Sequence, residues 1–148
     1  MNLALLAAQL KKDEGLKLVT YLDPVGLLTV GVGHLVLPQD QLVLGQAITA
    51  ATCQQWLDAD IEQAVVTCFR LWPDFDTLPE DVQQILANMA FQLGQSRLGK
   101  FVMLRQAITQ RDWPAAARAM RESLWYAQSG NRSKRLTTAM AAQGVPHA

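Results

Sequence analysis

The sequence predicts an α+β protein in which one short β-hairpin interrupts a chain that is otherwise helical. An apolar helical run ends at Gly15, a residue type that tolerates the left-handed conformation after a last helical turn. A hairpin pattern follows, with strands expected over 16–21 and 27–32 and the turn signal Asp23-Pro24-Val25-Gly26 between them. Beyond Pro73 every periodic segment has helical spacing.

The 148 residues fit one domain, with no repeat and no low-complexity linker. We expect a small β-lobe over about 14–48, a connecting helix over about 49–71, and a larger helical lobe over about 72–148 that also takes in residues 1–13.

The expected helix ends rest on capping residues. Thr49 is placed as the N-cap of the connecting helix, and Pro79 with two acidic neighbours opens a helix that continues to Gly94. A short helix carries the apolar positions from Leu98 to Ile108, and Asp112 caps the next one. The last two helices are expected over 124–127 and 132–142.

Composition excludes some classes of function and leaves others open. Thirteen basic and thirteen acidic residues cancel, so the total charge does not favour nucleic acid or an anionic surface. Cys53 and Cys68 are the only cysteines, and both fall in the connecting helix, roughly 22 Å apart at about 1.5 Å per residue. That distance is beyond disulfide reach, so we expect reduced cysteines, no metal site and no cofactor.

The N-terminal segment 1–10 is apolar but does not resemble a signal peptide, because no basic residues precede its short apolar run. No segment reaches the roughly eighteen apolar residues of a membrane span. We therefore expect a protein without stable membrane insertion.

Three side chains around the hairpin are suited to acid-base chemistry. Glu14 ends the first helix, Asp23 lies where the hairpin leaves its first strand, and Thr29 lies on the returning strand. Hydrolysis of a glycosidic bond uses two carboxyl groups, one that donates a proton to the leaving oxygen and one that stays ionised. The alternative for each is ordinary, since acidic residues at helix ends are usually solvated and threonine is a common strand residue.

The same stretch resembles a known family. The pattern E-G-L-x-L-x-x-Y-x-D-x-x-G-x-x-T-x-G-x-G-H runs from Glu14 to His34 and is similar to the N-terminal motif of the phage-type lysozymes, glycoside hydrolase family 24, most of all those of the T-even bacteriophages. The resemblance resumes in Asn88–Gly94 and in Trp125–Arg135, and is loose only over 35–47. It implies a lysozyme-like α+β fold.

The resemblance also implies roles for individual residues. Glu14 would be the general acid, Asp23 would position and activate water or stabilise an oxocarbenium-like charge, and Thr29 would help to hold that water. The implied reaction is hydrolysis of the β-1,4 bond between N-acetylmuramic acid and N-acetylglucosamine of peptidoglycan, with inversion. Gly31 and Gly33 are interpreted as close-packing positions without chemistry.

Substrate contacts are implied at Leu35 and Phe91, and Gln92 is a candidate for a hydrogen bond to substrate. Two further family contact positions are occupied here by Leu104 and Ala119, which lack the hydroxyl and the amide found there.

Supporting roles are expected for Tyr21, His34, Asp60, Asn88 and Arg132. We expect an ion pair between His34 and Asp60, and a pairing of Arg132 with Glu14. Ordinary capping and packing is the alternative for Arg132 and for Trp125, Tyr126 and Asn131.

The expected protein is a monomeric endolysin that lyses the host. It would stay in the bacterial cytoplasm until a partner such as a holin lets it reach the periplasm. Two alternatives remain open: a lysozyme fold kept as a non-catalytic binding or virion part, and a lysozyme domain from a tail-associated or toxin protein. The intact Glu14, Asp23 and Thr29 argue against the first, and the compact length with Met1 argues against the second.

Overall fold

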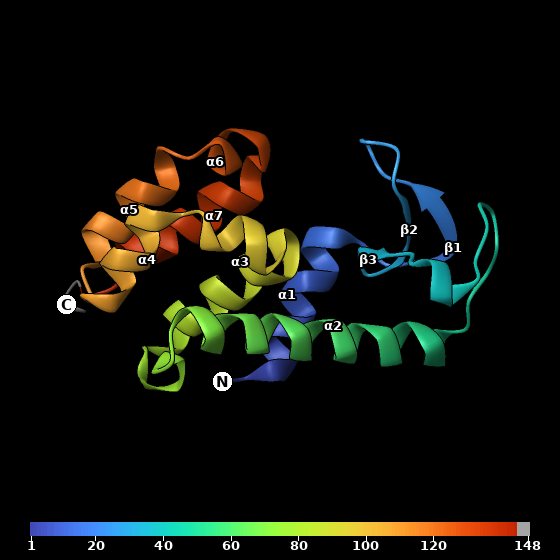
Figure 1. Cartoon of the computed structure of the whole chain (residues 1–148), viewed down its shortest axis with the longest axis horizontal. Helices are drawn as coiled ribbons and strands as arrows, with labels where there is room; N and C mark the ends of the chain where they lie inside the picture. The colour runs from blue at the N-terminus through green and yellow to red at the C-terminus, as the bar shows by residue number, and fades with distance from the viewer. Residues whose placement is uncertain (145–148) are drawn as a thin grey trace. The chain divides into compact units, whose positions relative to one another are not determined.

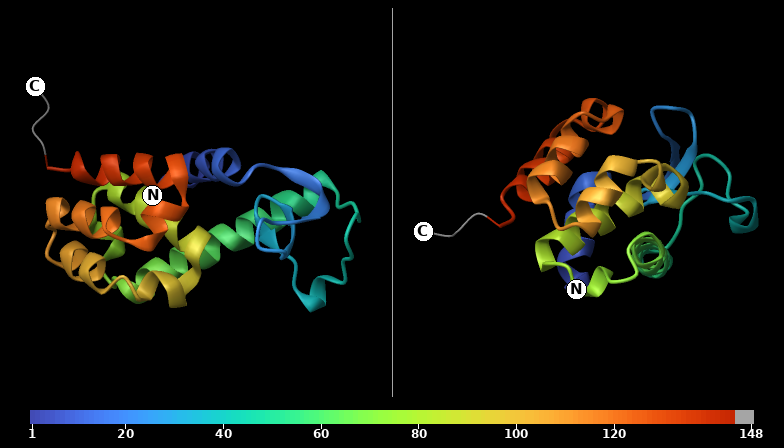
Figure 2. Two further views of the ribbon diagram at one scale, coloured as in Figure 1. Left: turned by 90° about the horizontal axis from the view of Figure 1, so that it is seen from above. Right: turned by 60° about the vertical axis from the view of Figure 1, so that its left-hand side comes forward.

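The computed structural model describes residues 1–144, and within them it contains seven α-helices and one three-stranded antiparallel sheet (Figure 1). This confirms the predicted α+β class. The chain divides into two compact units, one of residues 3–63 and one of residues 1–2 with 64–148. Helix α2 (Ala50–Leu71) runs without a break through the point of division, as Figure 2 shows.

The division places the first helix with the strands, whereas the sequence predicts residues 1–13 in the helical lobe. The expected lobe boundaries stay a prediction.

The unit of residues 3–63 begins with α1 (Leu3–Glu14) and continues into the sheet. Gly15 ends α1 in the left-handed region, at φ +76°, and its N–H donates to the carbonyl of Lys11 at 2.9 Å. The strands are β1 (Lys17–Leu22), β2 (Leu28–Gly31) and β3 (His34–Leu35), in the order β1-β2-β3. The hairpin and its turn are therefore where the sequence placed them, and β3 is an addition.

The loosely patterned stretch 35–47 is more ordered than its sequence indicated. It contains the 3₁₀ turn η1 (Pro38–Asp40) and then returns along β1, where Val19 and Ala47 form an antiparallel bridge. The Thr20 hydroxyl donates to the carbonyl of Val43 at 2.6 Å and accepts from the N–H of Gln46 at 3.1 Å. The Thr20 side chain thus adds to the backbone bridge in holding this loop against the sheet.

The unit that begins at residue 64 is helical. After η2 (Phe75–Thr77) come α3 (Glu80–Gly99), α4 (Val102–Thr109), α5 (Trp113–Arg121), α6 (Leu124–Gln128) and α7 (Gly130–Ala141). Its core consists of fully buried apolar side chains from these helices and from the segment 72–75 before them, among them Trp72, Phe75, Leu86, Met89, Leu98, Ile108, Met120 and Met140. None of the helices among residues 1–144 is long and apolar enough to cross a membrane.

Two helix ends follow the predicted caps, and one helix does not. The Thr49 and Asp112 side chains accept the N–H of Thr52 and of Ala115, both at 3.1 Å. At Gly94 the backbone leaves helical geometry (φ +75°, ψ 171°), but one more turn to Gly99 follows, so Leu98 belongs to α3 and α4 begins later than predicted.

Both cysteines are free and buried in α2, as expected for packing residues. Burial raises the pKa of the Cys68 thiol to about 12, which keeps it un-ionised at neutral pH.

Candidate active site around the β-hairpin

Glu14 occupies the last position of α1 and is half-buried. Its carboxylate lies directly against the backbone of Gly33, in the two-residue turn that joins β2 to β3. The end of a helix and a tight turn therefore meet at this carboxylate.

The hairpin turn itself holds the carboxylate of Asp23. Oδ1 accepts the N–H groups of Val25 at 3.0 Å and Leu27 at 2.8 Å, while the Asp23 N–H donates to the carbonyl of Leu27 at 2.9 Å. Aspartate favours this arrangement because its short side chain reaches the backbone two residues ahead. One oxygen is thus fixed by backbone donors, which sets the direction of the other.

Thr29 and Tyr21 share one face of the hairpin, near Asp23. Tyr21 is paired with Thr29 across β1 and β2, and directly opposite residues project to the same side of a sheet. Asp23 comes directly after β1, and its charge raises the pKa of Tyr21. The buried Thr29 hydroxyl donates to the carbonyl of Leu27 at 3.0 Å, which leaves its lone pairs to accept a hydrogen bond.

Tyr21 lies near enough to both carboxylates to be affected by their charges. Burial raises the pKa of the Tyr21 phenol, and the negative charges of Glu14 and then Asp23 raise it further. The ammonium of Lys17 lies 4.3 Å from the centre of the Tyr21 ring, on the same strand. The hairpin therefore gathers two carboxylates, a phenol and a hydroxyl, with one cation beside them.

His34 contacts two carboxylates, one predicted and one missed. Its Nδ1 lies 2.7 Å from Oδ2 of Asp60 on α2, as the sequence led us to expect, and its Nε2 lies 3.1 Å from Oδ2 of Asp40 on η1. The ring also stacks on Trp56, with centroids 4.6 Å apart. The hydrogen bond to Asp60 raises the pKa of His34, burial opposes this, and the bond to Asp40 adds to the increase.

The remaining predicted residues lie on several elements. Leu35 on β3 is exposed, at 46% of its surface. On α3, Phe91 is half-buried, and Gln92 accepts from the indole N–H of Trp125 at 2.8 Å and donates to the hydroxyl of Ser129 at 3.1 Å. The Gln92 amide is thus committed to side chains of the helical unit.

Arg132 on α7 is bound to the buried Asn88 of α3. Its Nε donates to the side-chain oxygen of Asn88 at 2.9 Å and one terminal nitrogen donates to the Asn88 carbonyl at 3.5 Å. The expected pairing of Arg132 with Glu14 stays a prediction, as do the roles of all the residues in this site.

Comparison with known sequences decides the family. The sequence pattern of the family described as Phage lysozyme matches residues 11–142, which is most of the chain. The chain belongs to the phage lysozyme family. This confirms the resemblance found in the motifs and the lysozyme-like fold, and it makes the protein an enzyme of the lysozyme class.

Individual relatives of this lysozyme differ in length. The pre-baseplate central spike protein Gp5 of Enterobacteria phage T4 is 31% identical over 89% of the chain, which spans only 27% of the spike protein. Probable T4-type lysozyme 1 of Dictyostelium discoideum is 28% identical over 86% of the chain and 88% of its own length. The endolysin of Salmonella phage P22 is 30% identical, with 75% of each chain covered.

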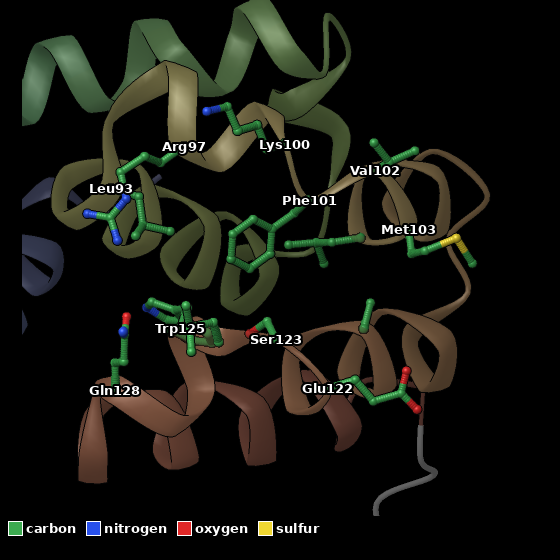
Figure 3. A pocket seen from close by; sticks show the side chains of 13 residues that line it. Leu93, Arg97, Lys100, Phe101, Val102, Met103, Glu122, Ser123, Trp125 and Gln128 are labelled. Carbon is green, nitrogen blue, oxygen red and sulfur yellow. The ribbon is translucent and has the colours of Figure 1, made fainter.

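A cavity of about 620 Å³ in the helical unit is lined in part by Leu104 and Ala119, the two positions where the sequence resemblance predicts altered substrate contacts. Figure 3 shows Phe101 and Trp125 directed toward one another across it, with ring centroids 6.4 Å apart. Leu104 is fully buried in the cavity wall. The sequence offered ordinary capping and packing as the alternative role of Trp125 and did not mark Phe101 as a site residue, since no motif identifies a wall built from four helices, α3, α4, α5 and α6.

Proposed function

We propose that this lysozyme is a muramidase that hydrolyses the β-1,4 bond between N-acetylmuramic acid and N-acetylglucosamine in bacterial peptidoglycan. The observation that carries the proposal is the gathering of Glu14, Asp23 and Thr29 around one hairpin in a chain of the lysozyme family. The names of two relatives, an endolysin and a peptidoglycan hydrolase of Pseudomonas phage phiKMV, support the same substrate.

The two carboxyl groups take different roles. Glu14, protonated, donates its proton to the glycosidic oxygen as the bond to the anomeric carbon breaks. Asp23, ionised, stabilises positive charge at that carbon and orients the attacking water, whose proton it accepts. Its fixed Oδ1 gives it a defined direction for this task. The Thr29 hydroxyl accepts a hydrogen bond from the same water. Attack from the face opposite the leaving group inverts the anomeric centre.

Product analysis tests this proposal. Purified peptidoglycan is digested, the new reducing ends are reduced with borohydride, and the sugars are identified. A muramidase leaves reduced N-acetylmuramic acid, so reduced N-acetylglucosamine would instead indicate a glucosaminidase and contradict the proposal. The anomer that forms first, followed by NMR before mutarotation, distinguishes inversion from retention.

The biological setting is part of the same proposal. As a monomeric endolysin the protein would act from inside the host, and a holin would open its way from the cytoplasm to the periplasm. The match to part of a phage spike protein supports a second candidate, a lysozyme carried on the virion. Mass spectrometry of purified particles separates the two, since an endolysin is absent from particles and abundant in lysates.

A further inference from the structure

Gly33 lies in the two-residue turn between β2 and β3, beside the carboxylate of Glu14. Its φ of +62° is in the left-handed region, which is one reason for glycine at this position. The second reason is space. A Cβ built on Gly33 would lie 2.6 Å from Oε2 of Glu14, 2.9 Å from Cδ and 3.1 Å from Cγ.

Contacts under 3.0 Å to a Cβ do not persist, so either the turn or the carboxylate would have to move if residue 33 had a side chain. The turn is held on both sides. Val30 before the turn and Val32 within it are buried, at 0% and 3% exposure, and His34 after it is bound by two carboxylates and stacked on Trp56. The end of the Glu14 side chain rotates at much lower cost, and it is therefore the part that would move.

We propose that Gly33 is a positioning residue for the general acid: the bare backbone of the β2–β3 turn forms the surface against which the Glu14 carboxylate is aligned. This inference rests on the proposed role of Glu14. A misplacement of about 1 Å at a reacting group costs roughly 10²-fold in rate, so a methyl group at this position is expected to affect catalysis more than folding.

The other glycines in and around the sheet differ from Gly33 in this respect. A Cβ on Gly31 would meet the sulfur of Cys53 at 3.2 Å, and one on Gly26 would meet nothing within 4 Å. Gly45, at φ +83° and also with nothing within 4 Å, lies in the loop before the bridge to β1. Gly45→Ala therefore imposes the same kind of backbone strain as Gly33→Ala without crowding a carboxylate, and is the matched control.

The test measures kcat and KM of wild type, Gly33→Ala, Gly45→Ala and Glu14→Gln on soluble glycan fragments. Gly33→Ala should lower kcat by about 10²-fold with KM changed less than about twofold, whereas Gly45→Ala should leave both within about twofold. In the Glu14→Gln background, Gly33→Ala should reduce the residual rate no further, because the acid it displaces is already absent.

Folding is followed in parallel by urea unfolding. Gly33→Ala should destabilise more than Gly45→Ala in the wild-type background and equally in the Glu14→Ala background, where the crowded atoms are gone. If Gly33→Ala does not fold, the Glu14→Ala/Gly33→Ala double variant should fold, and its failure to do so would overturn the inference.

The outcomes separate this inference from the proposed function. Full activity of Glu14→Gln would remove the general acid and with it both proposals. An inactive Glu14→Gln beside a fully active Gly33→Ala would leave the proposed function standing and refute the positioning role alone. Further loss on adding Gly33→Ala to Glu14→Gln would show that the glycine acts through the fold and not through the acid.

Discussion

Glu14 and Asp23 are held in different ways, and their proposed roles follow the difference. Asp23 has one oxygen fixed by two backbone N–H groups, which gives the other oxygen a defined direction in which to orient a water molecule. Glu14 ends a helix, and its carboxylate rests against the backbone of the β2–β3 turn. The proposed roles match these positions: a carboxylate with one fixed oxygen orients water, and a carboxylate aligned against a backbone turn donates a proton.

Substitution of the two carboxyl groups tests this assignment. Glu14→Gln keeps the shape and removes the proton donor, so the rate of lysis of outer-membrane-permeabilised cells should fall by about 10² to 10⁴-fold with the fold retained. Asp23→Asn should show a similar loss. Asp13→Asn, beside the acid but outside its proposed chemistry, should lyse at nearly the wild-type rate. Equal losses at all three positions would indicate a fragile loop and no specific acid.

The sequence could predict Asp23 as a turn residue, because the Asp-Pro-x-Gly signal and its hydrogen bonds are local. It could not predict that Gly33 touches Glu14. Nineteen positions separate them, and the contact depends on where a two-residue turn places its backbone in space. Asp40 was missed for a similar reason, since the loop that carries it has no periodic pattern to place its side chains.

At the scale of elements, His34 joins three parts of one unit. It sits on β3 and contacts Asp60 on α2, Asp40 on η1 and the ring of Trp56 on α2. Only the protonated imidazole can donate to both carboxylates at once, because neutral histidine has a single N–H. Loss of the proton therefore breaks one of the two contacts. We call His34, Asp40 and Asp60 the histidine clamp.

Stability should depend on pH through the histidine clamp. The pKa of His34 is raised, so its contribution is complete below the unfolded value of about 6.5 and is lost as pH rises through the folded value. For Asp40, burial alone would raise the pKa, but the Leu37 N–H and His34 together lower it. Its contribution is present above about 3.9 and is lost as pH falls through the lowered value. The clamp is strongest between roughly pH 4 and 6.5.

Urea unfolding of wild type, Asp40→Asn and Asp60→Asn from pH 3 to 8 measures the effect. Each substitution should cost about 1 kcal/mol near pH 5 to 6, at the low end for a bond to a charged group because the clamp is partly open to solvent. The cost should shrink toward pH 8, where His34 is neutral. A cost that does not vary with pH would show that neither carboxylate is coupled to the histidine.

Helix ends were predicted well where a side chain caps the backbone, as at Thr49 and Asp112, because capping depends on residues within one turn. Gly94 shows the limit of this reasoning. Its positive φ interrupts the helix as expected. The chain then forms one more helical turn, because that turn buries Leu98 at 0% exposure, and this packing outweighs the local signal for a helix end.

At the scale of the whole molecule, the fold class could be predicted from the sequence, because the apolar residues change from alternating to helical spacing along the chain. The family could be recognised from the sequence because most of its motif lies between Glu14 and His34. The wall of the 620 Å³ cavity could not be predicted, since its residues come from separate helices that become neighbours only after folding.

The absence of net charge has a consequence for the intact enzyme on its substrate. Thirteen acidic residues balance thirteen basic ones, so the molecule as a whole has no long-range attraction to an anionic cell wall. Raising the salt from about 0.01 to 0.1 M shortens the screening length from about 30 to about 10 Å. The rate of lysis should therefore change less than about twofold over that range, as a turbidity assay would show.

A charged variant provides the control for this expectation. Asp58 and Glu62 are exposed on α2, and replacing both with lysine raises the net charge by four, because each exchange removes one negative charge and adds one positive charge. This variant should bind isolated cell walls more tightly at 0.01 M salt and lose that advantage at about 0.1 M, where exposed charges are screened. A steep loss of wild-type lysis with salt would contradict the argument, because it would mean that a local cluster of cations, and not the balanced total, governs the approach to the wall.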